Sequence, residues 1–390
     1  MANLVRAILA NARSRFSRLF VPLSQSHSST KPAPRPQFLD EEIYKNRDYH
    51  PVSLGDTFDS KRYTILRKLG YGRYSTVWLA SDSKCQRYVA LKLLRVGCYD
   101  GPHPIFEREI LEKIQKVSRD SSHEGRKHIL PLIEHFSHRG PNGNHVCLTF
   151  DVLGHHLNLQ AVNNLKGQNI LLELETPNNT VSDYLESVPP RMIKDQDGVS
   201  IPLEEDIKMP HVSNMESLHV RIIDFGVASW REKHLFEKIQ PLALRAPEVA
   251  VGASWDTGVD IWTLGCLTIE FLHGLIIFPT SAPKKGTWTD EDEHLARIIE
   301  VLGPFPSSLL KKGRLSAEFF DEKGKLIRDP CYKRSSLECM LNGRVYPHNR
   351  PSGMSKNEFA VFVDFLKGML EIDPVKRKSA AELLKHEWLS

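Results

Sequence analysis

An acidic residue at the end of an apolar strand could hold a metal ion. The run R-I-I-D-F-G, Arg221 to Gly226, places Asp224 directly after such a strand and before a Phe-Gly pair. A carboxylate there can bind Mg²⁺ that bridges the β- and γ-phosphates of a nucleotide. The tripeptide A-P-E, Ala246 to Glu248, follows 22 residues after Asp224. Each motif occurs by chance when taken alone, so their combination with the motifs below carries the argument.

A glycine-rich turn stands between two strand patterns. It reads G-Y-G-R-Y-S-T-V, Gly70 to Val77, with Ser75 in the place of a third glycine. Gly70 and Gly72 allow close approach of the backbone to a phosphate. A dinucleotide-binding turn would lead into a helix, whereas this one leads into another strand. The pattern therefore favours a glycine-rich hairpin over a nucleoside triphosphate, although an ordinary tight hairpin fits this motif equally well.

A lysine inside an apolar run is the third candidate. The run V-A-L-K, Val89 to Lys92, lies on the third expected strand. A buried ammonium needs a partner of opposite charge, and Glu109, central on the next expected helix, is the predicted one. Lys92 would then contact the α- and β-phosphates. An unpaired, exposed lysine is the ordinary alternative.

The stretch A-V-N-N-L-K-G-Q-N-I-L-L-E, Ala161 to Glu173, is similar to a catalytic loop that runs into a strand. A phosphoryl-transfer loop carries its catalytic Asp five residues before a metal-binding Asn. Counting back from Asn169 reaches Asn164, with Lys166 between them. An amide cannot accept the proton of a substrate hydroxyl, and loss of a general base costs about 10²–10⁴-fold in rate. Positioning and metal electrostatics would still support weak transfer.

Two kinds of periodicity divide the chain. In the first half, apolar and polar residues alternate as they do in short strands, and one segment between the strands fits a helix. The expected strands cover 63–69, 75–81, 87–96, 128–136 and 145–153, and the helix covers 104–117. Helical spacing dominates the second half, over 257–274, 290–303, 357–371 and 379–389. The polar, Pro-punctuated segment 175–219 indicates a long surface insertion, or a flexible loop without a dedicated role.

Composition narrows the class of protein. The 390 residues are 41% hydrophobic and 26% charged, as in soluble globular proteins. A net charge of +4 gives no support to direct nucleic-acid binding. The six cysteines form no C-x-x-C pair, so a zinc site or disulfide framework is not expected and a reducing compartment fits better. No apolar run reaches the roughly 18–20 residues of a membrane span.

The first 39 residues differ from the rest of the chain. They contain no acidic residue, and their apolar positions recur at helical spacing among arginines and serines. This composition resembles a mitochondrial transit peptide, and a disordered basic tail is the alternative. Residues 40–62 are an irregular lead-in to the first strand.

Taken together and in order, these motifs resemble those of eukaryotic protein kinases over about residues 63–390. K-L-G-Y-G-R-Y-S-T-V-W-L-A, D-E-D-E-H-L-A-R-I-I-E-V-L-G and the closing H-E-W-L are similar to the SR-protein kinase family of Ser/Thr kinases. The resemblance implies an α+β, two-lobed fold: an N-lobe (63–153) of antiparallel sheet plus one helix, and a mainly helical C-lobe (154–390). It also implies ATP and Mg²⁺ as cofactors, Arg/Ser-rich protein substrates, a monomer, and a place in cytoplasm and nucleus.

The resemblance also assigns roles to individual residues. Nucleotide contacts fall on Leu69, Gly70, Tyr71, Gly72, Ser75, Val77, Ala90, Lys92, Glu109, Asp151 and Leu153. Asn169 and Asp224 would bind the metal, Lys166 the γ-phosphate, and Asn164 stands where the catalytic Asp would be. Glu293 and Glu300 fall where the family has an acidic groove for arginine-rich substrates, or on a solvated helix face. Arg377 would pair with Glu248.

One region departs from the family pattern. Asn164 comes only 11 positions after Leu153, where the family has several tens of residues that form two helices. The second of these helices packs in the centre of the C-lobe, so its loss would leave the helix over 257–274 short of a partner. Three explanations stay open: a deletion at an exon boundary or in the gene model, a pseudokinase that binds nucleotide or an Arg-rich partner without transfer, or a product that does not fold stably.

Overall fold

The protein is described here from a computed structural model. The described residues are 48–99, 101, 105–120, 122, 124–156, 169–194, 198, 200–205, 207, 219–273, 276–280, 282, 286–342 and 354–389, with positions 4, 7 and 8.

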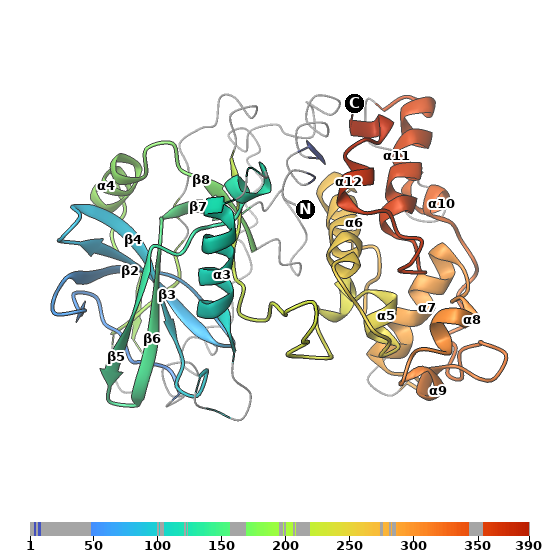
Figure 1. Ribbon diagram of the computed structural model, residues 1–390, viewed down its shortest axis with the longest axis horizontal. Helices are drawn as coiled ribbons and strands as arrows, with labels where there is room; N and C mark the ends of the chain where they lie inside the picture. The colour runs from blue at the N-terminus through green and yellow to red at the C-terminus, as the bar shows by residue number, and fades with distance from the viewer. Residues whose placement is uncertain are drawn as a thin grey trace. The chain divides into compact units, whose positions relative to one another are not determined.

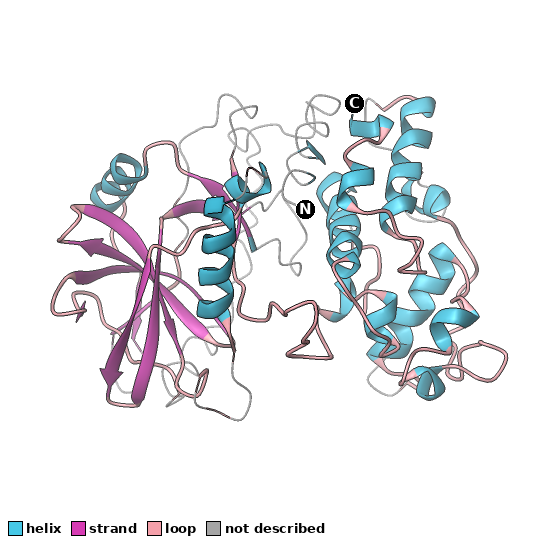
Figure 2. Ribbon diagram, viewed as in Figure 1, coloured by secondary structure: helices cyan, strands magenta, loops and turns pink. Residues whose placement is uncertain are grey.

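The chain forms two compact units, which are drawn in Figures 1 and 2. The sheet unit comprises Gln25–Leu157 and Gln168–Ala228, and the helical unit comprises Met1–Ser24, Asn158–Gly167 and Ser229–Ser390. This division differs from the expected boundary after residue 153, because the second segment of the sheet unit groups with the strands that precede it.

The sheet unit is built on six strands in the order β1-β2-β3-β4-β6-β5, with every neighbouring pair antiparallel. Their bounds are β1 Thr57–Phe58, β2 Tyr63–Gly72, β3 Ser75–Asp82, β4 Arg87–Leu94, β5 Glu134–Gly140 and β6 Gly143–Phe150. Alternate side chains of β2, β3 and β4, among them Tyr63, Trp78 and Leu91, pack in one apolar cluster. The other side of these strands carries the candidate site.

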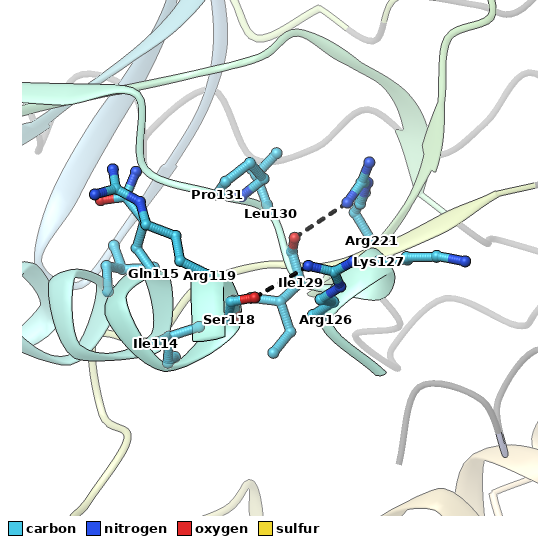
Figure 3. Close-up of a pocket in the computed structure, with 11 residues that line it drawn as sticks. Ile114, Gln115, Ser118, Arg119, Arg126, Lys127, Ile129, Leu130, Pro131 and Arg221 are labelled. Carbon is cyan, nitrogen blue, oxygen red and sulfur yellow. Dashed lines mark hydrogen bonds between the residues drawn. The ribbon is translucent and has the colours of Figure 1, made fainter. Parts of the chain in front are cut away.

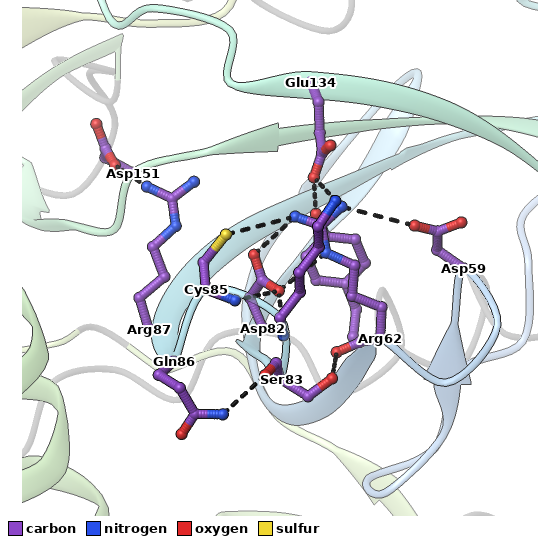
Figure 4. A network of polar contacts seen from close by, with 11 residues as sticks. Asp59, Arg62, Asp82, Ser83, Cys85, Gln86, Arg87, Glu134 and Asp151 are labelled. Atoms are coloured by element: carbon purple, nitrogen blue, oxygen red, sulfur yellow. Dashed lines mark hydrogen bonds and ion pairs between the residues drawn. The ribbon is translucent and has the colours of Figure 1, made fainter.

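A network centred on Arg62 joins three parts of this sheet (Figure 4). Its guanidinium makes two 2.9 Å hydrogen bonds to Asp82, at the end of β3, and lies 2.8 Å from Glu134 in β5. The Arg62 guanidinium holds the pKa of Asp82 at about 2, below its usual range. Tyr63 also donates a hydrogen bond to Glu134. The start of β2 is thereby fastened to β3 and β5.

The strand expected over residues 128–136 begins only at Glu134. The preceding residues run beside β11 Val220–Ile222 instead, where Leu130 N donates to Ile222 O at 3.1 Å and Ile129 bridges Ile222. Their apolar character reflects this packing and not a place in the six-stranded sheet. A tight turn joins β5 to β6, with Gly140 opposite Gly143.

A single helix, α3 Glu107–Asp120, follows β4, and the 3-10 helix η1 Glu124–His128 follows it. The helix was expected over 104–117 with Val117 in its apolar stripe, but Val117 is 51% exposed. The buried residues of α3 are Glu107, Ile110 and Leu111, which recur at i, i+3 and i+4.

A second sheet has the order β11-β8-β7. Its strands are β7 Leu153–His156, β8 Ile170–Glu173 and β11 Val220–Ile222, and each neighbouring pair is antiparallel. The pairing of β8 with β11 brings the residue before β8 next to the residues that follow β11. Two of the expected site motifs meet at that point.

The predicted insertion, 175–219, contains regular structure. It forms α4 Pro177–Ser187 and a hairpin of β9 Met192–Lys194 with β10 Ser200–Pro202. Val181 and Ile207 are buried in a cluster with Leu79, Val152 and Leu174. The described part of the insertion is therefore packed on the sheet unit, which then holds more than the one helix that was expected.

The helical unit is organised around α6 Gly258–His273, which packs against α11 Lys356–Met369. A Cβ at Gly265 would come within 3.0 Å of the Met369 Cβ, so only glycine permits this close approach. The other elements of the unit are η4 Leu242–Leu244, α5 Pro247–Ala250, α7 Asp290–Leu302, α8 Ser307–Leu310, α9 Ser316–Phe319, α10 Leu337–Leu341, α12 Ala380–Leu383 and η5 Glu387–Leu389.

Capping residues explain why the long helices begin where they do. Thr289 and Asp292 form a capping box at the start of α7, and Ser355 and Glu358 form another at the start of α11. Each box satisfies backbone N–H groups that the helix itself leaves unpaired. The helices expected over 257–274, 290–303 and 357–371 are thus present within about two residues at each end.

Part of the N-terminal leader belongs to the helical unit. Leu4 and Ile8 are helical positions one turn apart, and they are 0% and 1% exposed. The described leader residues are therefore packed and do not form a free tail. Among the helices that the structure describes, none is both long and apolar enough to cross a membrane.

Candidate active site

The strand register brings the expected motifs into one row. Gly70 of β2 lies opposite Val77 of β3, and Val77 lies opposite Lys92 of β4. Residues opposite one another in adjacent strands share a face of the sheet. Ala90 lies two residues before Lys92 and therefore on that same face, so the sheet assembles motifs that are far apart in the sequence.

The glycine-rich turn leaves open space beside its backbone. β2 and β3 close with Gly72 opposite Ser75, and no heavy atom of the described structure lies within 4 Å of where a Cβ on Gly72 would be. The Tyr49 hydroxyl lies 3.0 and 2.9 Å from the carbonyl oxygens of Gly72 and Arg73. Tyr49, which belongs to the lead-in segment, thus holds the turn in place. Ser75, at the other end of the turn, is buried. A phosphate fits such a cradle because no side chain fills it.

Lys92 lies between two carboxylates. Its Nζ is 2.6 Å from Glu107 Oε1 and 3.0 Å from Asp224 Oδ1. Burial by itself would lower the pKa of Lys92, but the charges of Glu107 and Asp224 outweigh it and raise that pKa above its ordinary value. The ammonium stays charged, as contact with phosphate oxygens requires.

Glu107, not Glu109, is the partner of Lys92, so this part of the sequence prediction was wrong. Residues two apart on a helix point about 200° apart, so Glu107 and Glu109 cannot both face the sheet. Glu107 is 1% exposed, whereas Glu109 pairs with the neighbouring Arg108. The spacing of Glu107 from Ile110 and Leu111 was the signal that could have found it, because these three share the buried face.

Glu107 also reaches the Asp-Phe-Gly motif. Its Oε1 accepts a hydrogen bond from Phe225 N at 3.2 Å, and Asp224 Oδ1 accepts one from Gly226 N at 3.4 Å. Asp224 has φ +65°, in the left-handed region that non-glycine residues seldom adopt and that is enriched at functional sites. The helix, the lysine strand and this motif are thus joined through one carboxylate.

The two expected metal ligands lie on adjacent chain segments. Ile223 N donates to Asn169 O at 2.9 Å, which puts Asn169 beside the residue preceding Asp224. The Asp224 side chain is 50% exposed, and Asn169 is exposed as well. Oxygen ligands of this kind suit Mg²⁺, which typically takes one or two protein ligands and completes its shell with phosphate oxygens and water. Within the described ranges, no group of three His, Cys, Asp or Glu could hold a metal alone.

One of the expected nucleotide contacts after β6 is engaged in the second sheet. Leu153 lies opposite Glu173 in the ladder of β7 with β8, and Asp151 is exposed and 3.6 Å from Arg87. Phe150 is buried and lies opposite Ala90. Leu69 and Tyr71 lie on β2 and are partly buried. Asn164 and Lys166 lie outside the described residues.

The two acids expected to dock a substrate are already paired within the chain. Glu293 accepts hydrogen bonds from the Tyr332 hydroxyl at 2.6 Å and from Trp288 Nε1 at 3.1 Å. Arg297 lies 3.1 Å from Glu293 and 2.9 Å from Glu300, and both acids are buried. The structure therefore supports neither an open acidic groove nor a solvated helix face at these positions, because both carboxylates are buried and pair with Arg297 of the same helix.

The expected pair of Glu248 with Arg377 is confirmed. Two hydrogen bonds of 2.7 and 2.9 Å join the guanidinium to the carboxylate, and both side chains are almost fully buried. Arg377 also donates to Gly258 O at the start of α6. The pair fastens α5 to the C-terminal part of the helical unit.

A basic pocket of about 370 Å³ lies beside the C-terminal half of α3 in the sheet unit (Figure 3). Its lining includes the C-terminal half of α3 and four basic residues, Arg119, Arg126, Lys127 and Arg221. Arg126 donates to Ser118 O at the end of the helix, and Arg221 donates to Ile129 O and pairs with Glu173. These contacts hold α3 close to β11, the strand that leads to Asp224.

Comparison with known proteins agrees with this arrangement. A family model for the protein kinase domain matches residues 63–389. Serine/threonine-protein kinase SRPK of Physarum polycephalum is 31% identical, over 90% of this chain and 90% of its own length. Protein kinase dsk1 of Schizosaccharomyces pombe is 28% identical, over 89% of this chain and 84% of its own length. The crystal structure of a kinase domain matches 88% of this chain and 99% of that domain, with a TM-score of 0.59 and 22% identity, which supports the fold. This chain belongs to the protein kinase family, and within it to the Ser/Thr SR-protein kinases.

Proposed function

We propose that the protein is an ATP-dependent serine/threonine kinase that uses Mg²⁺ and transfers the γ-phosphate to serine in Arg/Ser-rich proteins. The observation that carries the proposal is Lys92, buried between Glu107 and Asp224 at 2.6 and 3.0 Å. A buried ammonium between a helix carboxylate and a metal-binding carboxylate is the arrangement that protein kinases need for transfer.

Each described residue has one role in this proposal. Lys92 contacts the α- and β-phosphates, and Glu107 orients Lys92. Asp224 and Asn169 hold Mg²⁺, which supplies positive charge to the β- and γ-phosphate oxygens. The turn Gly70–Gly72 covers the phosphates with its backbone. Asp224 pairs with Lys92, so its carboxylate is oriented towards the place where the phosphates would lie.

The substrate part of the proposal rests on family membership. Its test is a transfer assay on a peptide of alternating Arg and Ser, with a matched peptide in which every Arg is Lys. Preference for the Arg peptide is expected, because a guanidinium can form the bidentate contacts with carboxylates that an ammonium cannot. Equal use of both peptides would contradict the proposed preference for arginine-containing substrates.

We propose further that the protein acts as a monomer in cytoplasm or nucleus. Light scattering tests the oligomeric state, and imaging of a tagged chain tests the compartment.

A nucleotide-binding pseudokinase is the second candidate, because Asn164 occupies the place of the catalytic Asp. Both candidates bind ATP, and only transfer separates them. The experiment compares the wild type, Asn164→Asp and Lys92→Met for ATP binding and for phosphate transfer. Transfer by the wild type supports the kinase, and Asn164→Asp should then raise the rate about 10²–10⁴-fold. ATP binding without transfer in both the wild type and Asn164→Asp supports the pseudokinase. Absence of ATP binding in the wild type contradicts both candidates.

A further inference from the structure

A residue outside the region that matches the family model contacts the glycine-rich turn. The match begins at residue 63, and Tyr49 precedes it. The Tyr49 hydroxyl lies 3.0 Å from Gly72 O and 2.9 Å from Arg73 O, so its single proton is shared between two carbonyl groups. Burial raises the pKa of Tyr49 above its ordinary value, so the hydroxyl keeps this proton and acts as a donor.

The main chain of Tyr49 is fixed to the sheet unit on both sides of its Cα. Val96 N, just after β4, donates to Asp48 O at 2.7 Å. Asn142 Nδ2, between β5 and β6, donates to Tyr49 O at 2.7 Å. The ring of the next residue, His50, stacks on a histidine ring of β5 with 4.7 Å between the ring centroids. Since Tyr49 itself is only 9% exposed, its hydroxyl has little freedom to leave the turn.

The next carbonyl of the turn is held from the residues after β4. Arg95 N donates to Tyr74 O at 2.9 Å, and the Cys98 thiol lies 3.6 Å from the same oxygen. The Arg95 guanidinium also lies over the Tyr74 ring, 5.4 Å from its centroid. Three successive carbonyl oxygens, those of residues 72–74, are therefore bound by protein donors.

The N–H groups of the turn stay available to a ligand. In a trans peptide unit the carbonyl and the N–H point in opposite directions, and the carbonyls of Gly72 and Arg73 share their units with the N–H groups of Arg73 and Tyr74. While Tyr49 holds both carbonyls, these N–H groups point away from its hydroxyl. Within the described part of the chain, neither N–H donates to another backbone group. Successive backbone N–H groups in a turn can bind an anion.

We propose that Tyr49 is a positioning residue for the nucleotide phosphates. Its hydroxyl holds two peptide units in the orientation that presents the N–H groups of Arg73 and Tyr74 to a phosphate. Without the hydroxyl, these units can rotate and turn a carbonyl oxygen towards the phosphates, and this oxygen would repel them. The inference rests on the proposed function, because it concerns the phosphates bound at the same nucleotide site.

Removal of the hydroxyl alone tests this proposal. Tyr49→Phe should lower the affinity for MgATP about three- to tenfold, as expected for the loss of one hydrogen bond. Its affinity for adenosine, which has no phosphates, should stay unchanged. Tyr88→Phe is the matched control, because it removes a hydroxyl of β4 that lies 3.2 Å from Ser182 Oγ in α4 and should change neither affinity. Titration calorimetry measures the affinities, and thermal unfolding should show similar losses of stability in both variants.

A second variant acts through the same hydroxyl. Asn142→Ala removes the hydrogen bond to Tyr49 O and keeps the tyrosine. It should lower the affinity for MgATP about two- to threefold and leave that for adenosine unchanged. Because both changes act through one contact, the double variant should bind MgATP as Tyr49→Phe does. Losses that add fully in the double variant would contradict this shared route.

Other results would overturn the inference and leave the proposed function standing. One is an equal MgATP affinity of the wild type and Tyr49→Phe. Another is an equal loss for MgATP and adenosine in Tyr49→Phe, which would show that the hydroxyl supports the fold in general and not the phosphates. A matching loss of MgATP affinity in Tyr88→Phe would lead to the same conclusion. If the wild type binds no MgATP, the proposed function is contradicted and the inference fails with it.

Discussion

At the scale of single residues, the site depends on one buried cation with two anionic partners. Lys92 is nearly buried, and the loss of either carboxylate would leave an ammonium that the surrounding protein satisfies poorly. Glu107 contributes most, because the same oxygen also accepts the N–H of Phe225. Glu109, two positions away, pairs instead with the neighbouring Arg108. The two glutamates therefore form a natural pair of test and control.

The first prediction concerns these two glutamates. Glu107→Gln should weaken MgATP binding by about tenfold or more, because Lys92 loses a charged partner and its orientation towards the phosphates. Glu109→Gln should change the affinity by less than about twofold. Calorimetric titration of both variants checks this. Equal losses would show that α3 presents both carboxylates to the site, contrary to the structure.

The second prediction concerns the buried pair of Glu248 and Arg377. Glu248→Gln leaves a buried guanidinium without its counter-charge, so the free energy of unfolding should fall by about 3–5 kcal/mol. The exposed pair of Lys238 with Glu291 is the control, and Lys238→Met should cost at most about 1 kcal/mol. Urea unfolding of both variants measures the difference. A small loss in Glu248→Gln would mean that water reaches the guanidinium.

At the scale of elements, α6 is the central helix of the helical unit and is buried on most of its surface. It carries Glu270, which is buried and whose Oε2 has no hydrogen-bond partner among the described residues. Burial raises the pKa of Glu270 to about 7. A helix buried on nearly all sides can accept a carboxyl group at low cost only while that group holds its proton.

The third prediction follows from this titration. The folded protein keeps a proton on Glu270 that the unfolded chain releases above pH 4.5, so stability falls as pH rises from 4.5 through about 7. Glu270→Gln removes the titrating group. Its free energy of unfolding should match that of the wild type near pH 5 and exceed it by about 2 kcal/mol at pH 8. Chemical unfolding at both pH values checks this, and a difference independent of pH would contradict it.

At the scale of the whole molecule, the described residues of the N-terminal leader belong to the same compact unit as the helices. Leu4 and Ile8 bury apolar side chains there, at positions that composition alone assigned to a transit peptide or a free tail. Burial of two such side chains contributes about 3–6 kcal/mol, a large share of the stability of an ordinary domain. Removal of the leader would therefore expose part of this core.

The fourth prediction tests the contribution of the leader. Leu4→Glu with Ile8→Glu should lower the melting temperature of the helical unit by several degrees, because two carboxylates would have to be buried without partners. Ala7→Ser, at a partly exposed position of the same segment, should have little effect. Thermal unfolding followed by circular dichroism measures both. An unchanged melting temperature in the double variant would show that the leader is dispensable for folding.

Local patterns predicted most of the elements correctly. The strands β2, β3 and β4 and the helices α6, α7 and α11 follow from periodicity of two or 3.6 and from capping residues, because these signals act within a few residues of one another. The segment 128–133 was taken for strand because its apolar residues are those of a buried run. Its partner is β11, which lies 93 residues later at the bridge of Ile129 with Ile222, and no local pattern carries that information.

The sequence by itself determined the family and the residues that could bind ATP and Mg²⁺, since residue type and order along the chain define those motifs. Tertiary structure decided which partners they have. It chose Glu107 over Glu109, paired Glu293 and Glu300 with Arg297, and packed the described part of the insertion on the sheet unit. Each of these outcomes depends on which groups folding brings within about 3 Å and removes from water, and residue order alone leaves that distance open.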